Sequence, residues 1–444
     1  MSPRTANLSL DQAPPISVPL RFFLTAPVLG LVAALLALAA GPDLYSSRWN
    51  PYTLAITHLF TLGFMAQIMC GAILQMLPVV AGAPVPHVTR IAKLSHPLLT
   101  AGVLLLATSL LFTDQYWSLL ASICLILGFT IYLAATGLAL WRNRTSSPVF
   151  QALVLALFSL LLTLLLGLVL LAAYRDWFVL PGINILADVH LSWGLFGWIG
   201  LLLLGIAYQV VPMFQITPEY PAWMKKSLVL WLFGSLLLWS GLQITPLLNA
   251  RQTYPVLQTL TRLAIFGGFV LFCIITLRLQ YRRKRRIADV TLLFWRLAMY
   301  CAILAFSLWL LAQVLPSWSD SVQYPLLLGI LLLLGFGCSV MNGMLYKIVP
   351  FLSWFHLQNR QLALQRTDVR LPNMKQFIGD MAAKRQLQLF TVALLAAILA
   401  VFWAQWLSYV AAGLLGLSWL LLGNNLLGAV RRYRFSYRHL TTPK

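Results

Sequence analysis

Apolar residues dominate twelve long stretches of the chain, and short polar segments separate them. Apolar runs of about 18 residues or more are typical of helices that cross a bilayer, because its hydrocarbon core is about 30 Å thick. The pattern predicts an all-α polytopic membrane protein in which residues 1–444 form a single transmembrane domain. The predicted spans cover about 19–40, 54–81, 91–113, 117–141, 149–173, 187–213, 224–247, 255–279, 291–315, 324–351, 387–407 and 409–430.

One connection, 352–386, is much longer than the others. It combines apolar residues such as Trp354 and Leu357 with basic residues such as Arg360 and Arg366. It is too polar to span a membrane, so we expect a cytoplasmic loop, part of which forms an amphipathic helix at the membrane surface.

Lysine and arginine residues gather in every second connection. The rich connections hold Arg90, Lys93, Arg142, Arg144, Lys225, Lys226, the run 282–286 and the tail residues Arg431, Arg432, Arg434 and Arg438. The alternate connections hold little more than Arg48, Arg175 and Arg251. Because positive charge resists translocation, this imbalance predicts a bacterial-type inner-membrane protein with both termini in the cytoplasm.

Composition agrees with this class of protein. The chain is 60% hydrophobic and only 9% charged, whereas soluble domains carry about 25% charged residues. Its net charge of +21 follows from the basic connections, so the sequence indicates a lipid bilayer as partner and no nucleic acid. The run 282–286 also suits anionic lipid headgroups, although topology alone explains it.

The second, sixth and tenth spans share a pattern of two glycines eight residues apart, then Gln or Lys, then Pro. The copies are Gly63, Gly71, Gln75 and Pro78; Gly197, Gly205, Gln209 and Pro212; and Gly335, Gly343, Lys347 and Pro350. They follow one another at intervals of 134 and 138 residues, which is four spans each time. Glycines with this spacing let neighbouring helices approach closely, and the prolines interrupt the helical hydrogen bonds. The repeat predicts three four-helix units, at about 19–141, 149–280 and 291–430, around a pseudo-threefold axis.

Two of the six histidines lie inside these repeated spans. His58 and His190 precede the first glycine of the second and sixth spans by five and seven residues. A histidine inside a membrane is expensive to bury and is usually paired or ligated, and neutral imidazole is the commonest metal ligand. Both residues are therefore candidate metal ligands, with polar helix packing as the alternative. The other four are expected at the headgroups (His96 and His356) or in solvent (His87 and His439).

Twelve spans in three groups of four, with histidines in the outer halves of spans two and six, resemble subunit I of the heme-copper oxidases and nitric oxide reductases. Several stretches are similar to the NnrS-like branch, whose members are heme- and copper-containing membrane proteins associated with nitric oxide tolerance. These stretches are ProLeuArgPhePheLeuThrAlaPro (19–27), ThrHisLeuPheThrLeuGlyPhe (57–64), GlnMetLeuProValValAlaGly (75–82) and HisLeuSerTrpGlyLeuPheGly (190–197).

The resemblance implies that His58 binds heme and His190 binds copper, and that the protein interacts with a redox partner or a small gas ligand. The sequence also departs from the oxidases. Their seventh span carries a histidine pair that 225–235 lacks, and their tenth span supplies heme ligands, whereas 324–351 has no histidine. The resemblance therefore implies nitric oxide or respiratory stress handling without a complete oxidase centre. Any heme would then be five-coordinate or would take its sixth ligand from elsewhere, with Met341 as one option.

Catalytic residues are not identified by the sequence, because no Ser/His/Asp constellation, phosphate loop or carboxylate pair is evident. Asp188 lies two residues before His190 and is expected either to orient that imidazole as a second partner or to stabilise a helix start. Two other functions stay open. Repeats and proline-interrupted helices also occur in secondary transporters, although their repeats are usually halves of the chain. A non-catalytic assembly or scaffold protein with an oxidase-like fold is the third possibility.

The predicted topology can be tested with reporter fusions at the two termini and after residue 380. All three reporters are expected to give a cytoplasmic signal, because each follows a segment rich in lysine and arginine or begins the chain on that side. An external signal at any of the three positions would contradict the charge argument.

Overall fold

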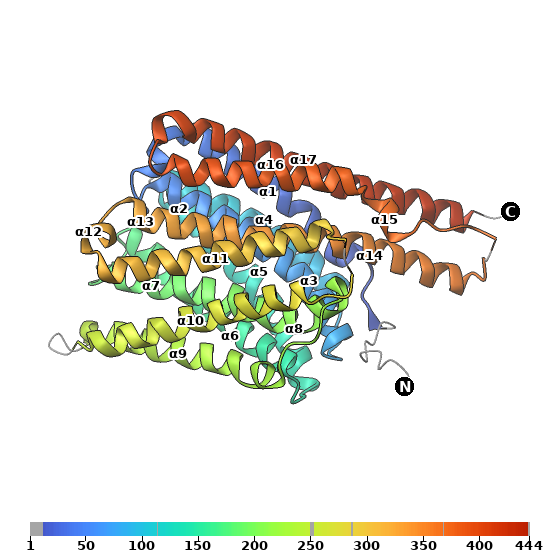
Figure 1. The fold of residues 1–444 in the computed structure, drawn as a ribbon, viewed down its shortest axis with the longest axis horizontal. Helices are drawn as coiled ribbons and strands as arrows, with labels where there is room; N and C mark the ends of the chain where they lie inside the picture. Colours follow the sequence, from blue (N-terminus) through green and yellow to red (C-terminus); the bar gives the residue numbers. More distant parts are fainter. Residues whose placement is uncertain (1–11, 113, 249–252, 286, 367, 443–444) are drawn as a thin grey trace. The chain divides into compact units, whose positions relative to one another are not determined.

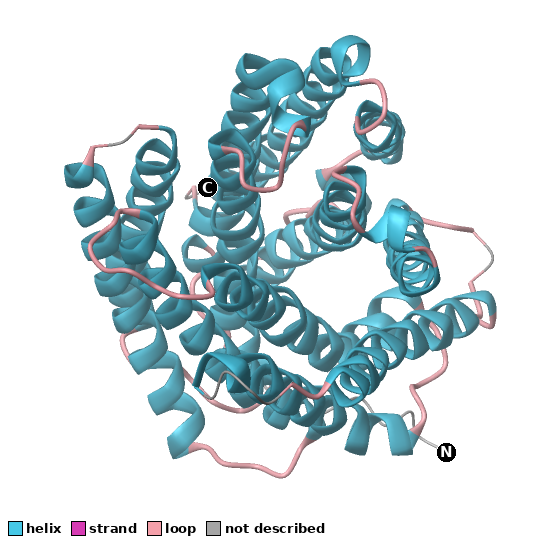
Figure 2. Cartoon of the chain, turned by 90° about the vertical axis from the view of Figure 1, so that its left-hand side faces the viewer, coloured by secondary structure: helices cyan, strands magenta, loops and turns pink. Residues whose placement is uncertain are grey.

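The structure is a computed structural model that describes residues 12–112, 114–248, 253–285, 287–366 and 368–442 (Figure 1). Within these residues every regular element is a helix and none is a strand (Figure 2). Twelve of the described helical segments are long and apolar enough to cross a membrane. The predicted class, an all-α protein with twelve candidate spans, is confirmed at this level.

The helices form two compact units. Unit 1 comprises Met1–Ala13, Met76–Ile91 and Thr113–Arg286, and unit 2 comprises Pro14–Gln75, Ala92–Phe112 and Ile287–Lys444. Unit 1 thus contains the fourth to eighth spans, whereas unit 2 combines the first span, most of the second and third, and the last four. Neither unit is a continuous half of the chain.

Unit 2 begins with α1 (Ser17–Ala40), which continues into the 3-10 helix η2 (Gly41–Tyr45). The second span joins α2 (Pro51–His58), η3 (Leu59–Met65) and α3 (Ala66–Val80), and the third is α4 (Val88–Leu111). The later elements are α11 (Val290–Val314), α12 (Pro316–Ser319), α13 (Gln323–Gly329), η5 (Ile330–Cys338), α14 (Ser339–Ala363), α15 (Met374–Phe377), α16 (Asp380–Ala400) and α17 (Ala404–Thr441). Side-chain caps set two of the helix starts, since Asn50 accepts from the Tyr52 amide and Asp289 from the Leu292 amide.

Unit 1 contains α5 (Gln115–Arg142), α6 (Pro148–Tyr174), α9 (Ala222–Leu248) and α10 (Pro255–Tyr281). Its sixth span joins α7 (Ile183–Ser192), η4 (Trp193–Gly200) and α8 (Leu201–Gln215). Ser147 caps α6 by accepting from the Phe150 amide, and Pro148 occupies the first turn, where no backbone donor is needed. Local sequence therefore fixes where this span begins.

Three spans contain a π-helical segment, and they are the three that carry the glycine repeat. Segments η3, η4 and η5 each include the first glycine of their copy, which is Gly63, Gly197 or Gly335. A π-helical segment is rare and is found frequently at functional sites. The second, sixth and tenth spans thus share a local backbone feature as well as a sequence pattern.

Each repeat glycine faces the span that precedes it in the chain. A Cβ atom at Gly63 would meet Leu29 at 3.1 Å, and one at Gly71 would meet Phe22 at 2.9 Å. The corresponding neighbours are Ser159 and Ala152 for Gly197 and Gly205, and Cys301 and Phe294 for Gly335 and Gly343. In all three helix pairs the two contacted residues are seven positions apart. The pairs formed by spans one and two, five and six, and nine and ten therefore share one antiparallel register.

The segment 352–386 differs from the prediction of a loop. Helix α14 continues to Ala363, and α15 and α16 begin at Met374 and Asp380. With 38 residues α17 is about 57 Å long, well beyond the 30 Å hydrocarbon core. Within unit 2, α14, α15 and the end of α17 project together at the right of Figure 1. Leu357, Phe377 and Leu440 are buried there, so packing keeps this extension helical where the sequence is too polar to span.

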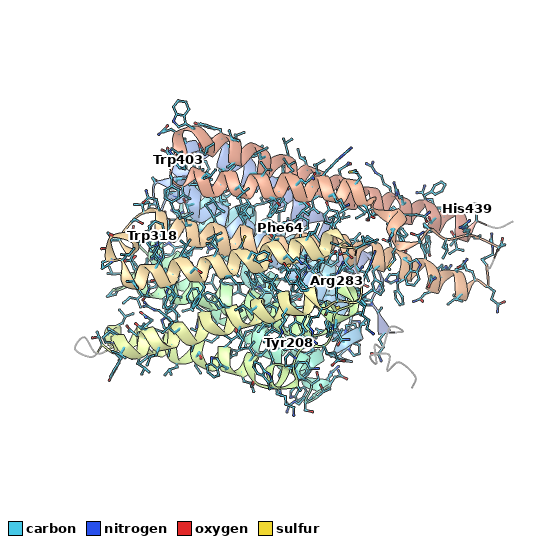
Figure 3. The ribbon with its side chains drawn as sticks, viewed as in Figure 1. Phe64, Tyr208, Arg283, Trp318, Trp403 and His439 are labelled. Atoms are coloured by element: carbon cyan, nitrogen blue, oxygen red, sulfur yellow. The ribbon has the colours of Figure 1, made fainter. Side chains whose placement is uncertain are left out.

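Aromatic residues mark the opposite end of unit 2. Figure 3 shows Trp403 and Trp318 at that end and His439 at the other end of α17. Trp403 and Trp406 are 56% and 80% exposed, as expected for side chains in the interfacial aromatic belt of a membrane protein. We refer to the end where α1 begins and α17 finishes as the terminal end.

Replacing Gly205 by alanine tests the close packing of the repeat. The added Cβ would overlap the Cβ of Ala152, and overpacking of this kind typically costs about 1–3 kcal/mol. We therefore expect a lower apparent melting temperature in detergent. The matched control is Gly234→Ala in α9, where a Cβ would meet nothing within 4 Å. Equal melting temperatures for the two variants would contradict the packing role of Gly205.

Candidate metal-binding histidines

His58 is the last residue of α2 and directly precedes the π-helical segment η3. Its Nδ1 lies 2.8 Å from the carbonyl oxygen of Leu54, one turn earlier in the same helix. A carbonyl oxygen only accepts hydrogen bonds, so the proton of the neutral ring is assigned to Nδ1 and the lone pair to Nε2. This is the tautomer in which a histidine coordinates a metal through Nε2 while its other nitrogen is held by a backbone carbonyl.

His190 lies in α7, three residues before η4. Its Nδ1 lies 3.0 Å from the carbonyl oxygen of Thr163 on α6, which assigns the same tautomer. Gly167, one turn further along α6, faces the ring, because a Cβ there would lie 3.0 Å from His190 Cε1. Helix α6 therefore supplies both the acceptor that orients this imidazole and the space that it occupies.

The two histidines share a side-chain arrangement, but they lie in different units. His58 is in unit 2 and His190 is in unit 1. Both rings are half-buried, and both have interactions beyond the Nδ1 bonds described above. His58 and His190 are therefore two separate candidate ligands.

Asp188 lies in the second turn of α7, which begins at Ile183. It is not in the first turn, so it does not stabilise the helix start, which was one of its two expected roles. The acceptor at His190 Nδ1 is the Thr163 carbonyl, so the carboxylate is not needed at that nitrogen. Asp188 is half-buried and takes part in interactions of its own.

Met341 is buried on α14, in the same unit as His58. The second and tenth spans run in the same direction in Figure 1. A Cβ at Gly337 would meet Met65, so these two residues lie at the same height along the helix axes. His58 lies seven residues before Met65, and Met341 lies four residues after Gly337. At about 1.5 Å per residue, the two residues are offset by roughly 16 Å along the helix axes. Both side chains would have to reach toward each other across this offset to bind one iron, so Met341 stays a prediction as the sixth ligand.

The remaining histidines occupy other environments. His96 Nε2 lies 2.8 Å from Thr25 Oγ1, and the Thr25 hydroxyl also contacts the Arg21 carbonyl oxygen at 2.9 Å. The threonine has one hydroxyl proton, so it donates to Arg21 and accepts from His96. The His356 ring is half-buried and lies against Phe355, and His87 and His439 are exposed, as the sequence predicts for the last two.

Thr163 and Gly167 are the residues that the sequence did not identify. Thr163 contributes a backbone carbonyl, which any residue type carries, and therefore leaves no signal in a single sequence. Gly167 does interrupt an otherwise leucine-rich span, but its role becomes visible only when α6 is placed beside α7. The neighbouring helix, not the local sequence, completes the environment of His190.

Among the described residues, no group of three or more His, Cys, Asp or Glu side chains is arranged to hold a metal ion. A bare copper or zinc ion usually needs three or four protein ligands. Heme differs, because the porphyrin supplies four nitrogens and the protein needs to add only an axial ligand. A histidine anchored to a carbonyl through Nδ1, as His58 is, could serve as such an axial ligand. No protein-family model matches this chain, and no curated protein is significantly similar to it.

Proposed function

We propose that this protein is a heme-binding integral membrane protein of the NnrS-like type, related to subunit I of the heme-copper oxidases, that handles nitric oxide or respiratory stress. The observation that carries the proposal is the environment of His58. Its Nδ1 is bound to the Leu54 carbonyl and its Nε2 is the lone-pair nitrogen, at the junction of α2 and the π-helical η3. This is the donor chemistry that an axial heme ligand requires.

The proposed fold is a set of three four-helix units around a pseudo-threefold axis, as in oxidase subunit I. Support comes from the shared register of the three glycine-packed helix pairs and from the π-helical segment in each second member. In this arrangement Gly63, Gly197 and Gly335 are equivalent positions. His58 and His190 then lie at similar depths near the same ends of equivalent helices.

His58 would hold the heme iron, and bound heme would supply reversible binding of a small gas ligand such as nitric oxide. This chain's own residues orient the imidazole and half-bury it. Copper is the second proposed cofactor, with His190 as one ligand held in place by Thr163 and Gly167. A copper ion there would need further ligands, such as waters or the Asp188 carboxylate.

A complete oxidase centre is not part of the proposal. The segment 225–235 in the seventh span and the segment 324–351 in the tenth have no histidine. Any redox chemistry would depend on an external redox partner, and catalysis is not assigned to a residue of this chain. From the basic connections, we propose the bacterial inner membrane as the location, with both termini in the cytoplasm.

A secondary transporter is the main alternative. Polar residues buried between α14, α16 and α17 would suit a substrate path, and π-helical segments interrupt three spans. Transporters with inverted repeats usually divide into sequential halves, however, whereas the two units here hold interleaved parts of the chain. A scaffold protein with an oxidase-like fold remains the alternative if no metal binds.

An optical spectrum of protein purified from a heme-replete host tests the heme proposal. We expect a Soret band, and we expect His58→Ala to abolish or shift it because the axial ligand is lost. His87→Ala is the matched control, since this ring is exposed in a connection and should leave the spectrum unchanged. Wild-type protein without a Soret band would exclude heme, and an unchanged spectrum in His58→Ala would exclude His58 as its ligand.

Metal analysis of the same preparations tests the copper proposal. We expect His190→Ala to lower the copper content, and Gly167→Ala to lower it less, because the added Cβ displaces the ring without removing the ligand atom. Gly137→Ala serves as the control, since a Cβ there would meet nothing within 4 Å. Copper content that is equal in wild type and His190→Ala would contradict this assignment.

A further inference from the structure

A hydrogen-bonded network of polar side chains lies inside unit 2, where α14, α16 and α17 pack together. In one layer, Asn425 Nδ2 donates to the Tyr346 hydroxyl at 2.9 Å. One to two turns away, Gln386 Nε2 donates to Ser418 Oγ at 3.0 Å and lies 3.5 Å from Asn342 Oδ1. Three helices thus direct polar groups toward one another in two successive layers of a membrane-spanning bundle.

The second layer is fully buried, and its hydrogen bonds are incomplete. Asn342, Gln386 and Ser418 are each 0% exposed. Asn342 Nδ2 donates to the Cys338 carbonyl at 2.9 Å, but Gln386 Oε1 has no partner among the described residues. The Ser418 and Tyr346 hydroxyls accept hydrogen bonds, and no described residue accepts a hydrogen bond from either of them. One acceptor and two donors therefore remain to be satisfied.

Helix packing alone does not account for these groups. Hydrogen bonds between spans hold membrane helices together, which explains the bonds that are made. A buried polar atom without a partner is costly, and most of all inside a membrane, where no solvent is available to replace the partner. The remaining acceptor and donors require a ligand that both donates and accepts hydrogen bonds.

We propose that this network is an internal hydration site that binds ordered water inside unit 2. Water donates to Gln386 Oε1 and accepts from the Ser418 and Tyr346 hydroxyls, whereas a metal cation would leave both hydroxyl protons unsatisfied. Polar groups continue toward the terminal end, because Lys347, next to Tyr346, lies 3.7 Å from Asp289 and both side chains are partly exposed. Water reaches the site from that end. The site does not depend on the proposed heme or copper.

Radiolytic hydroxyl-radical labelling of the full-length protein in lipid nanodiscs tests the proposal. X-rays generate radicals from water in place, so a buried side chain is oxidised when ordered water lies beside it. The reporters are Cys338, Met341 and Met344, which flank Asn342, and the comparators are Cys273 and Met299. Cys338 and Cys273 are both 0% exposed and form the matched pair, whereas Met341 and Met344 are 7% exposed and Met299 is 0% exposed. We expect several-fold faster oxidation of the reporters than of comparators of the same residue type.

Gln386→Met removes the unsatisfied acceptor with little change in volume, and we expect it to reduce labelling of the reporters to the level of the comparators. Gln280→Met is the matched control, because Gln280 is also fully buried with an Oε1 that has no partner in the described part of the chain, but it lies in unit 1. It should leave the reporters unchanged. If Gln386→Met does not fold, Ser418→Ala removes one donor and should also slow labelling.

Two results would overturn the proposal. Wild-type reporters that are oxidised as slowly as Cys273 and Met299 would show that the network is dry. A melting temperature that rises saturably with sodium or potassium in the wild type, but not in Gln386→Met, would show that the ligand is a cation instead of water.

Discussion

The need to satisfy every polar group inside a membrane governs this structure more than any single contact. Backbone groups are satisfied within helices, and many polar side chains bond to backbone carbonyls or to one another. Thr61, Ser159, Thr163 and Ser240 each donate to the carbonyl four residues earlier. His58 Nδ1 likewise bonds to the Leu54 carbonyl in its own helix, and His190 Nδ1 bonds to the Thr163 carbonyl of a neighbouring helix. The constraint that makes a membrane histidine acceptable also selects the tautomer with its lone pair on Nε2.

The sequence alone is sufficient to predict the helical class and the number of candidate spans, because both depend on the length of apolar runs. Sequence-based prediction fails where contacts between distant segments determine how far a helix extends. The extension of α14 beyond 351 and of α17 to Thr441 depends on contacts among α14, α15 and α17, on which Leu357, Phe377 and Leu440 are buried. Hydropathy identifies 352–386 as too polar to span a membrane. It does not indicate that α14 and α17 continue as helices beyond their apolar segments.

The candidate sites show the same division between local and non-local information. Histidines at intramembrane positions stand out in any hydropathy profile, so His58 and His190 are visible from the sequence. The acceptors at their Nδ1 atoms are backbone carbonyls, which no residue type reveals. Met341 is buried as a ligand would be, but the sequence gives no sign of its level relative to His58, which the contact between Met65 and Gly337 reveals. The glycine repeat is only partly predictable. Its pattern can be read from the sequence, but the residues that each glycine contacts lie on the preceding span and become known only from the structure.

The length of α17 has a mechanical consequence. Helix α17 runs without interruption from Ala404 to Thr441. It has 38 residues and contains no proline. Such a helix behaves as a stiff rod, because bending it sharply requires breaking successive backbone hydrogen bonds. Ser418 and Asn425 lie along this rod, and Arg432 near its tip bonds to the Gln376 carbonyl. A sideways displacement of the tip would therefore be transmitted along the helix to both polar residues.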